Sequence, residues 1–405
     1  MITEALPVNI DGDEWRSAKL STHQSTTSRA MSAEDTWERV QPILGDYGIT
    51  RVANVTGLDT VGIPVFTALK PMGRSLSSGS GKGTTDMAAR VGAAMEAIEQ
   101  TVWEAQPLGD IVASEAQLAA ADQLFISTQR LARLRDNLLS VDRPLHWTAG
   151  WDIVSQREIL VPSLAACIPD SYRGVWGGTQ ISTNGLASGN TVLEAVTSGL
   201  LEVIERDAVS YHTTTRRTVD LGTVTDPLAN ELLARIATAG LHAELVDFTV
   251  DTAVPTYGVT LTDRDHSSVG SFSGYGSSLS SRVALVRALT EAAQVRTLVV
   301  AGSRDDIFDM ERRAWSLVGS RRHTLNADSD NRFIDSDDGT DSFEGDIHAV
   351  LGKLADIGIT QVVVIRHTRS SDPVQVVRVI VPDLLASMMR GTETFPHLRP
   401  GGGRR

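Results

Sequence analysis

The sequence predicts an α/β (α+β) fold in which small mixed β-sheets carry helices that follow glycine-rich turns directly. Two observations predict it. Apolar residues alternate along paired segments, as in half-buried strands, and glycine-rich segments run straight into stretches with helical periodicity. The chain has 405 residues, enough to bury one large or two moderate cores. Because it lacks a Gly-x-Gly-x-x-Gly fingerprint, a dinucleotide-binding fold is not favoured.

The N-terminal half begins with a leader and a first helix, which together make up residues 1–50. Residues 17–31 are rich in hydroxyl groups and basic in an otherwise acidic chain, which is typical of a flexible leader, and a helix is expected at 32–44. The segments 49–56 and 64–71 alternate as a pair of strands. A glycine turn at 77–84 then leads into a first acidic helix. Residues 113–139 favour helices, and strands are expected between 147 and 161.

The C-terminal half repeats this pattern after a second acidic helix. We expect a short helix at 231–239, sheet segments at 241–250, 254–263 and 268–276, and then a third helix. Residues 326–346 are acidic, rich in serine and poor in apolar groups, which favours a mobile surface loop. Two buried strands follow at 359–368 and 374–385, and residues 391–405 are expected to form a polar C-terminal tail.

Composition argues against several classes of protein. The net charge is −13, whereas proteins that bind a nucleic-acid backbone cluster Lys and Arg, so we expect no nucleic-acid partner. No segment is apolar and long enough to cross a bilayer, and the N-terminus lacks the pattern of a signal peptide. We therefore expect a cytoplasmic protein with no membrane partner. The single cysteine, Cys167, excludes an intramolecular disulfide, and we interpret it as a small packed side chain.

The helix expected after residue 191 carries acidic residues at helical spacing. Thr191 and Glu194 have the form of a capping box at its N-terminus. At about 100° per residue, one side of this helix is apolar, while Glu194, Ser198, Glu202 and Glu205 share an arc of roughly 80° on another side. A solvated surface helix is the alternative, but such a face normally mixes Lys with Glu, and no Lys occurs between residues 185 and 212. The acidic face therefore indicates a cationic ligand.

The same pattern occurs elsewhere along the chain. Residues 78–100 and 184–206 align without a gap, and they share two glycines, a threonine and a Glu-x-x-Glu motif. The acid pairs are Glu96 with Glu99 and Glu202 with Glu205. A third, weaker copy at 274–296 has Glu291 and Gln294 in place of the acid pair. Glycines at the same distance from each pair favour two related ligand-binding helices over a chance match.

Two acid pairs facing one cavity need a counter-charge. Carboxylates about 4 Å apart repel each other by about 4 kcal/mol at an effective dielectric constant of roughly 20. Mg²⁺ prefers oxygen ligands and typically uses one or two carboxylates together with waters and substrate phosphates. The acid pairs therefore predict Mg²⁺ that bridges a polyphosphate. Basic side chains are expected to meet the phosphate oxygens: Lys82, Arg206, Arg287, Arg296 and Arg304.

Several motifs in this order resemble the YcaO superfamily of ATP-dependent peptide-modifying enzymes. They are SGSGKG with the helix end EAIEQ, TNGLASGN with LLEVIERDA, and RALTEAAQVR with AGSRDD. The similarity runs from Arg51 to Val379, and both the order and the spacing of the motifs match. The resemblance implies a YcaO-like catalytic domain over residues 51–390. It also implies that residues 1–50 contribute to a nucleotide pocket, with Lys19, Ser28 and Arg29 as candidates.

The resemblance also implies roles for individual residues. The family's first motif, Ser-x3-Glu-x2-Glu-Arg, keeps Glu96 and Glu99 but has Gly92 and Gln100 in place of its Ser and Arg. The second motif is intact at Ser198, Glu202, Glu205 and Arg206, preceded by Asn190. The third motif keeps Gln294, and its arginine is either Arg296 or Arg304. The implied Mg²⁺ ligands are Glu96, Glu99, Glu202 and Glu205. The implied ATP ligands are Lys82, Asn190, Ser198, Arg206, Gln294 and Arg296.

The chemistry common to the resembled family is activation of a backbone amide. A nucleophile adds to the carbonyl carbon, and ATP phosphorylates the oxygen so that it leaves as phosphate. Residues 48–65 and the AGSRDD segment are most similar to the branch associated with TfuA proteins, for which the resemblance implies thioamide formation. Stand-alone members that form azolines or amidines share the motifs. Of the Pro-x-Pro-x-Pro ending of many azoline-forming members, only Pro396 and Pro400 are present.

The resemblance implies a precursor peptide as substrate and a TfuA-like protein as partner, and it leaves self-association open. Two other classes of function also stay open. The first is a non-catalytic protein that presents a peptide to a partner enzyme, because Gly92 and Gln100 alter the first motif. The second is an ATP-dependent phosphotransferase that acts on a small molecule. No residue in the sequence stands out as the base that takes the amide proton.

Overall fold

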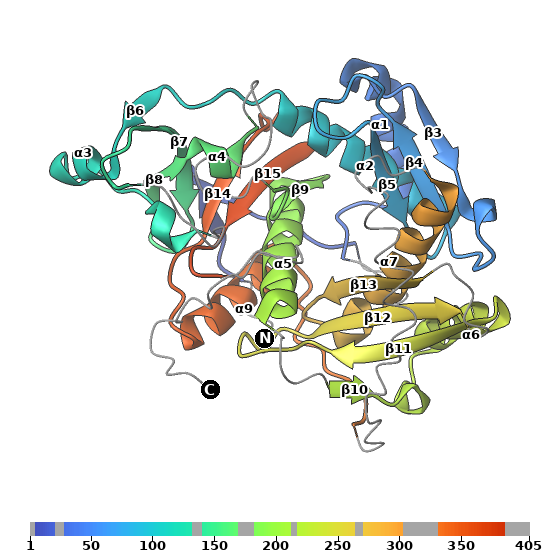
Figure 1. The fold of residues 1–405 in the computed structure, drawn as a ribbon. Coiled ribbons are helices and arrows are strands. Elements are labelled where there is room, and N and C mark those ends of the chain that lie inside the picture. The colour runs from blue at the N-terminus through green and yellow to red at the C-terminus, as the bar shows by residue number, and fades with distance from the viewer. Residues whose placement is uncertain are drawn as a thin grey trace.

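The computed structural model describes residues 5–20, 28–131, 140–168, 182–211, 217–263, 270–302 and 331–384. Several small sheets are covered by helices (Figure 1), which confirms the predicted α/β (α+β) class. The pairs between named strands in these ranges are antiparallel. None of the described helices is long and apolar enough to cross a membrane.

A three-stranded sheet carries the first acidic helix. Its strands, in order, are β3 (Arg51–Asn54), β4 (Val65–Leu69) and β5 (Ser78–Lys82), and α2 (Asp86–Glu104) packs on β4 and β5. The helix expected at 32–44 is α1 (Ala33–Val40), which packs on α2 and continues as a 3₁₀ helix over Gln41–Tyr47. Thr85 caps α2, because its side chain accepts a hydrogen bond from the backbone N–H of Ala88.

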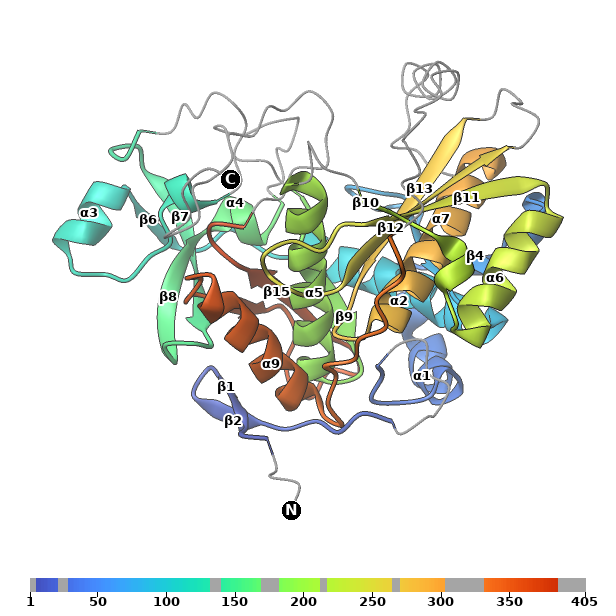
Figure 2. The same cartoon turned by 90° about the horizontal axis from the view of Figure 1, so that it is seen from below.

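A six-stranded sheet supports the second acidic helix. Five of its strands run in the order β6 (Ile111–Ala113), β7 (Leu145–Asp152), β14 (Val363–Arg366), β15 (Gln375–Ile380) and β9 (Leu186–Gly189), and β8 (Arg157–Pro162) pairs with β7. Helix α5 (Val192–Tyr211) packs on β15 and β9, and α9 (Phe343–Asp356) packs on α5. Seen from below, α5 stands between α9 and the α2–α7 side of the molecule (Figure 2). The short helices α3 (Glu115–Ala120) and α4 (Ser163–Ala166) lie at the far end of this sheet.

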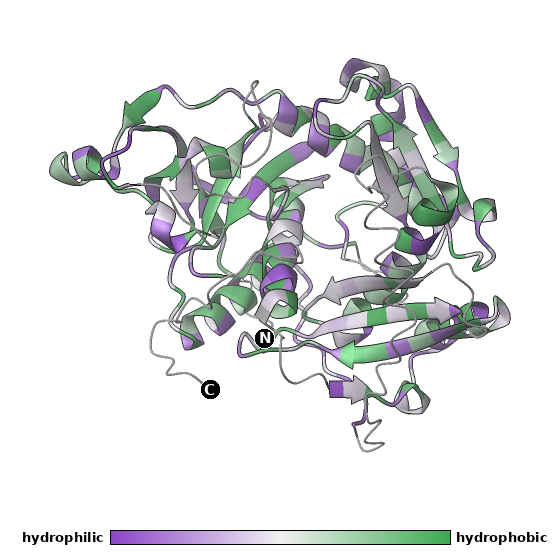
Figure 3. Cartoon of the chain, in the orientation of Figure 1, coloured by the Kyte–Doolittle hydropathy of each residue, from purple (hydrophilic) through white to green (hydrophobic). Residues whose placement is uncertain are grey.

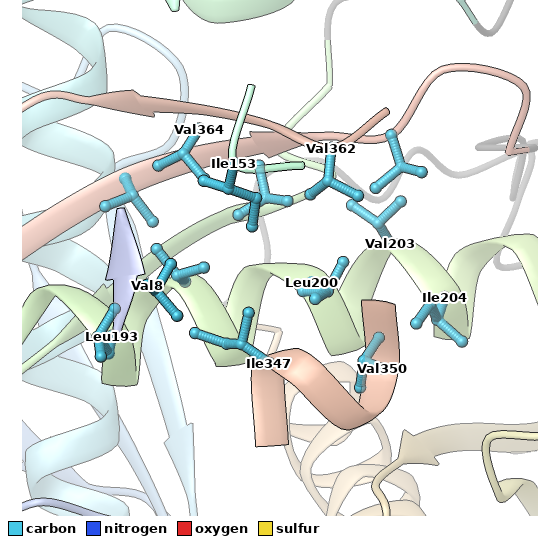
Figure 4. Close-up of a cluster of buried hydrophobic side chains, with 14 of the residues drawn as sticks. Val8, Ile153, Leu193, Leu200, Val203, Ile204, Ile347, Val350, Val362 and Val364 are labelled. Atoms are coloured by element: carbon cyan, nitrogen blue, oxygen red, sulfur yellow. The ribbon is translucent and has the colours of Figure 1, made fainter. Parts of the chain in front are cut away.

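The apolar side of α5 forms the largest described core. The residues predicted to pack there are buried, which confirms that prediction: Val192, Val196, Leu200, Val203 and Ile204. Figure 4 shows Leu200, Val203 and Ile204 near Ile347 and Val350 of α9, with Val362 and the β14 residue Val364 on the other side of α5. Hydrophilic residues interrupt the hydrophobic ones along α5 in Figure 3, as expected for a helix with two different faces.

A four-stranded sheet carries the third helix. Its strands, in order, are β10 (Arg217–Val219), β11 (Leu241–Asp247), β12 (Thr256–Asp263) and β13 (Ser271–Ser277). Helices α6 (Pro227–Thr238) and α7 (Ser281–Ala301) pack against each other, with α6 on β11 and α7 on β12 and β13. A two-stranded sheet of β1 (Val8–Ile10) and β2 (Asp13–Trp15) contributes Val8 and Ile10 to the core around α5.

The glycine-rich segments predicted as turns are mostly strands, which corrects the sequence reading. Of the glycines in the segments 77–84 and 184–190, only Gly185, with φ of +77°, has turn geometry that favours glycine. A Cβ added to Gly81 would lie 2.0 Å from the carbonyl oxygen of Ala89 in α2. One added to Gly276 would lie 2.2 Å from the carbonyl oxygen of Ala284 in α7. These glycines are needed because each helix lies directly on its strand, with no space for a side chain between them.

Two other element predictions hold only in part. In the acidic segment 326–346, the described residues 331–342 are hydrogen-bonded to the fold, for example from the N–H of Asp338 to the carbonyl of Leu279. Its last four residues form the first turn of α9, where Ser342 caps the helix and Phe343 is buried. In the segment 113–139, Ala113 ends β6, and the helical parts among the described residues are α3 and a 3₁₀ turn at Thr128–Arg130. Amino-acid composition predicts poorly where a helix begins when a single capping residue and a single buried apolar residue, here Ser342 and Phe343, determine its start.

Candidate functional site

A cavity of about 700 Å³ lies where α2, α5 and α7 meet. Each helix contributes polar side chains to its wall: Glu96 and Glu99 from α2, Ser198, Glu202, Glu205 and Arg206 from α5, and Arg287, Glu291 and Gln294 from α7. Lys82, Ser188 and Asn190 line it from β5, β9 and the residue after β9. The structure thus brings together the residues predicted to bind Mg²⁺ and all but one of those predicted to bind ATP.

The exception is Arg296, which does not line this cavity. Its Nε lies 3.1 Å from Oδ2 of Asp59, and its Nη1 lies 3.5 Å from Oδ1 of Asp263. Gln294 and Arg296 are two residues apart on α7, so they point in different directions. Arg304, the other arginine considered for this motif, lies outside the described residues. Arg287 is two helical turns before Gln294 and does line the cavity.

The three helices present equivalent positions to the cavity. A Cβ on Gly79 would lie 2.5 Å from the N of Ala97, and one on Gly274 would lie 2.1 Å from the N of Ala292. Glu96 and Glu291 directly precede these alanines, so they are structurally equivalent. Glu291 and Gln294 therefore stand where Glu96 and Glu99 stand in α2, as the sequence predicted.

We call β5–α2, β9–α5 and β13–α7 the first, second and third units. They meet head to tail, because α2 lies against β9, α5 against β13 and α7 against β5. A residue at the end of each strand contacts an acid on the neighbouring helix. Ser188 hydrogen-bonds to Glu99, the N–H of Ser277 donates to Oε2 of Glu205 at 3.0 Å, and Lys82 forms an ion pair with Glu291. The three contacts thus form a ring, in which Ser188 and Ser277 bond the second acid of a Glu-x-x-Glu pair while Lys82 bonds Glu291, the equivalent of the first.

The remaining acids also have protein partners. Glu96 accepts hydrogen bonds from the N–H of Ser80 at 3.0 Å and from Nε2 of Gln100 at 3.1 Å. Gln100, which stands where the family motif has Arg, is buried and supports Glu96 rather than reaching the cavity. Glu202 lies 3.3 Å from Nη2 of Arg206, one turn further along α5. The carboxylates are therefore held in place without a bound ligand.

Burial raises the pKa of several of these acids. Burial and the neighbouring carboxylates Glu202 and Glu96 hold the pKa of Glu99 well above its usual range. Burial also raises the pKa of Glu202, against the charges of Arg206 and Arg378. The pKa of Glu205 rises to about 7, because of burial and the nearby charge of Glu291. Among the described residues, burial and mutual repulsion thus favour the protonated form of these three acids more than an exposed position would.

Glu291 differs from the other acids. Burial acts to raise its pKa, but Lys82, Arg206 and Arg287 together hold that pKa below its usual value. Lys82 is hydrogen-bonded to Glu291 as well as paired with it. Glu291 is therefore an ionised carboxylate whose counter-charge is a lysine, in a cavity where Glu99 and Glu205 tend to take up protons.

A buried arginine that the sequence interpretation missed lies close to Glu99 and Glu202. Arg378 on β15 is 6% exposed, and its Nε and Nη1 atoms have no hydrogen-bond partner in the described part of the chain. Burial lowers its pKa to about 10, against the charges of Glu202 and Glu99. The signal was a single charged residue inside the apolar strand QVVRVI. Arg378 supplies positive charge to the acids without lining the cavity.

The N-terminal segment closes one side of the cavity. Arg29 lines it and lies 3.3 Å from Oε1 of Glu194, whose Oε2 accepts a hydrogen bond from the N–H of Ala30 at 3.3 Å. The predicted capping box is half right. Thr191 accepts from the N–H of Glu194 at 3.2 Å, but Glu194 bonds the N–H of Asn190 at 3.1 Å. Of the other leader candidates, Lys19 lies elsewhere, paired with Asp346, and Ser28 does not line the cavity.

The donor set fits a cation that is shared with a phosphate ligand. Within the described ranges, no three acidic, His or Cys side chains are close enough to hold a metal ion by themselves. The acids face one cavity, and each has a hydrogen-bond donor or a cation of the protein as partner. Mg²⁺ typically takes one or two carboxylates and completes its shell with waters and phosphate oxygens, so it does not require a closed protein cage.

The raised pKa of Glu205 predicts a pH dependence for the metal-free protein. Its carboxyl group ionises at about 7 in the folded state but near the ordinary value of 4.5 in the unfolded chain, so the unfolded state binds fewer protons between these values. We expect the melting temperature to fall as the pH rises through this range, and to fall less in Glu205→Gln. Thermal unfolding in a chelator, at intervals from about pH 5 to about pH 8, measures this. An equal loss in both proteins would contradict the assignment.

Comparisons with known proteins agree with this arrangement. The family model described as YcaO cyclodehydratase, ATP- and Mg²⁺-binding, matches residues 80–385. A protein named for its place in the tfuA 3′ region of Rhizobium leguminosarum bv. trifolii is 33% identical over 373 residues, which is 88% of this chain and 88% of its own. A Methanothermobacter thermautotrophicus protein is 34% identical over 371 residues, covering 88% of this chain and 94% of its own.

Two solved structures share the fold. The structure of YcaO from Methanopyrus kandleri bound with AMPPCP and Mg²⁺ matches with a TM-score of 0.69 at 22% identity, covering 93% of this chain and 99% of that one. A heterocyclase in complex with substrate and cofactor matches with a TM-score of 0.72 at 19% identity, covering 91% of this chain and 54% of that one.

Proposed function

Because this chain belongs to the YcaO family, we propose that it uses ATP and Mg²⁺ to activate a backbone amide in a precursor peptide. In this reaction a nucleophile adds to the amide carbonyl carbon, and the carbonyl oxygen accepts the γ-phosphoryl group of ATP. The oxygen then leaves as phosphate, and ADP remains. An amide oxygen is a poor leaving group, so its phosphorylation is the step for which ATP is needed.

The observation that carries the proposal is the charge of the cavity wall. Carboxylates and cations from three separate helices converge there, at the positions where the family motifs fall. Phosphoryl transfer depends mainly on positioning and electrostatic stabilisation, which a rigid polar cavity of this kind supplies. A scaffold that only presented a peptide would not need several buried carboxylates, because leaving them unneutralised destabilises the fold.

The proposal gives each group of residues a task. Glu96, Glu99, Glu202 and Glu205 would hold Mg²⁺, which when bound neutralises the acids and the developing charge on the phosphates. Lys82, Arg206 and Arg287 would contact phosphate oxygens, and we assign to Arg287 the contact that the sequence suggested for Arg296. Asn190, Ser198 and Gln294 would orient ATP. Residues 1–50 would complete the nucleotide pocket of a catalytic domain over 51–390, as the position of Arg29 supports.

We further propose that the product is a thioamide, formed with a TfuA-like partner protein. The relative named for the tfuA 3′ region supports this choice over an azoline or amidine. The test is incubation of the protein with neighbouring short precursor peptides, ATP, Mg²⁺ and a sulfide source, with and without such a partner, followed by mass spectrometry. Exchange of an oxygen for a sulfur indicates a thioamide, whereas loss of water indicates an azoline or amidine.

Nucleotide binding and ATP turnover separate the other classes of function. Calorimetry that shows no binding of ATP, with or without Mg²⁺, would favour the peptide-presenting scaffold and contradict the proposal. ATP turnover that needs no peptide, with a phosphorylated small molecule as product, would instead indicate a phosphotransferase. ATP consumption that depends on the peptide, together with a mass change in that peptide, supports amide activation.

A further inference from the structure

We propose that Lys82 and Glu291 form an exchangeable ion pair. In the protein without ligand, the ammonium group of Lys82 neutralises the carboxylate of Glu291, and binding of Mg²⁺ and ATP separates the two side chains so that Glu291 can bind the metal. The inference rests on the proposed function and assigns to Glu291 a role as an additional carboxylate for the metal. Both side chains line the cavity, and they contact each other across the junction of the first and third units. The sequence placed Glu291 in the third, weaker copy of the acid-pair pattern but did not include it among the predicted Mg²⁺ ligands.

The ring of similar contacts shows what is unusual about this pair. Lys82, Ser188 and Ser277 occupy the same place at the end of β5, β9 and β13, and each contacts an acid on the next helix. Two of the three contacts use serine, and at Ser277 the donor is a backbone N–H that cannot move away from the acid. The third uses a lysine, whose ammonium group sits on a flexible four-carbon stem. The contacts at Ser188 and Ser277 each include a backbone N–H donor, whereas the contact to Glu291 is made by two side chains.

The exposure of the pair fits an exchangeable contact. The side chain of Lys82 is 22% exposed and that of Glu291 is 26% exposed, so both can be reached from the cavity. The fully buried pair of Lys70 and Glu104, at 3% and 7%, shows what a permanent ion pair looks like in this chain. There the acid also accepts hydrogen bonds from the N–H groups of Arg74 and Ser75. Among the described residues, no backbone N–H donates a hydrogen bond to Glu291.

The structural equivalence of Glu291 and Glu96 supports a role for Glu291 in binding the metal. Glu96, Glu202 and Glu291 stand at matching positions on three helices that surround one cavity, and two of them are assigned to Mg²⁺. Without ligand, Lys82 neutralises Glu291 and is not available to a phosphate. When Mg²⁺ and ATP enter together, a divalent cation can replace the ammonium group at Glu291 while Lys82 turns to a phosphate oxygen. After the exchange, Glu291 is neutralised by the metal ion and Lys82 by a phosphate group, so neither charge is left without a counter-charge.

The test measures metal binding without nucleotide, using Mn²⁺ as the probe and electron paramagnetic resonance of free Mn²⁺ as the readout. If Lys82 competes with the metal for Glu291, then Lys82→Gln should raise the affinity for Mn²⁺ at least roughly fivefold, which corresponds to about 1 kcal/mol. In the double variant Lys82→Gln with Glu291→Gln, the affinity should equal that of Glu291→Gln alone. Lys82→Arg keeps the charge and should keep the wild-type affinity.

A matched control separates competition from a general change in charge. Arg29 also lines the cavity, but its partner is Glu194, so Arg29→Gln removes one positive charge without releasing Glu291. An equal gain in Mn²⁺ affinity for Arg29→Gln and Lys82→Gln would overturn the proposal, as would a gain from Lys82→Gln that persists in the Glu291→Gln background. Melting temperatures of all variants confirm that each is folded.

A second measurement replaces Glu291 instead of Lys82 and follows nucleotide binding instead of metal binding. In the absence of metal, Glu291→Gln should bind a non-hydrolysable ATP analogue more tightly than the wild type, because Lys82 is released and one negative charge is removed. Unchanged or weaker binding would contradict the exchange. Failure of the proposed function has a different signature: the wild type and every variant would bind neither Mn²⁺ nor the analogue.

Discussion

Replacement of Glu202 with glutamine is expected to weaken the binding of ATP with Mg²⁺ roughly 100-fold or more and to abolish peptide modification. Loss of one charged partner in a desolvated contact typically costs 2–5 kcal/mol, and about 1.4 kcal/mol corresponds to a factor of ten. The substitution keeps the shape of the side chain but removes its charge, so α5 should keep its packing. Calorimetric titration with a non-hydrolysable ATP analogue, with and without Mg²⁺, measures the change.

The control for this variant is Glu231→Gln. Glu231 lies on α6, is 56% exposed, and pairs with Arg235 one turn away. Exposed ion pairs of this kind contribute little, so the affinity and the melting temperature should stay close to those of the wild type. Equal nucleotide affinity in Glu202→Gln and Glu231→Gln would remove Glu202 from the site.

Replacement of Gly81 with alanine is expected to destabilise the protein by about 3 kcal/mol or more. The added Cβ would lie 2.0 Å from the carbonyl oxygen of Ala89 and 2.2 Å from the N of Ala93. Both atoms belong to the backbone of α2, so the helix itself must move. Because α2 carries Glu96 and Glu99, nucleotide binding should weaken as well. Urea denaturation followed by circular dichroism measures the change in the free energy of unfolding.

Gly352→Ala is the matched control. Gly352 lies inside α9, where an added Cβ would meet nothing within 4 Å. Alanine is favoured over glycine in a helix interior by about 1 kcal/mol, so this variant should be at least as stable as the wild type. If Gly81→Ala were as stable as Gly352→Ala, the close approach of β5 and α2 would be excluded.

The acidic helices were predictable because periodicity determines which side of a helix is buried. Leu200 and Ile204 pack, and Glu202 and Glu205 face the cavity, as expected from their spacing alone. The internal repeat added that Glu96 and Glu99 belong to the same kind of unit. These predictions succeeded because they depend on residues close to each other in the sequence, where helix geometry relates position to direction.

The remaining features depend on contacts that are distant in the sequence. Glycines such as Gly81 resemble turn formers until the helix that covers them is known. Arg378 lies on β15, far in the sequence from Glu99 and Glu202, so only the tertiary structure shows that these charges are close. Arg296 matched a motif by type, but two acids hold it on another side of α7.

The three helices that line the cavity, α2, α5 and α7, pack into three different hydrophobic cores. A ligand bound between the three helices therefore couples the unfolding of three cores that could otherwise unfold separately. Scanning calorimetry of the protein without ligand would then show a broad or divided heat-absorption peak, and saturation with nucleotide and metal would merge it into a single, sharper one at higher temperature.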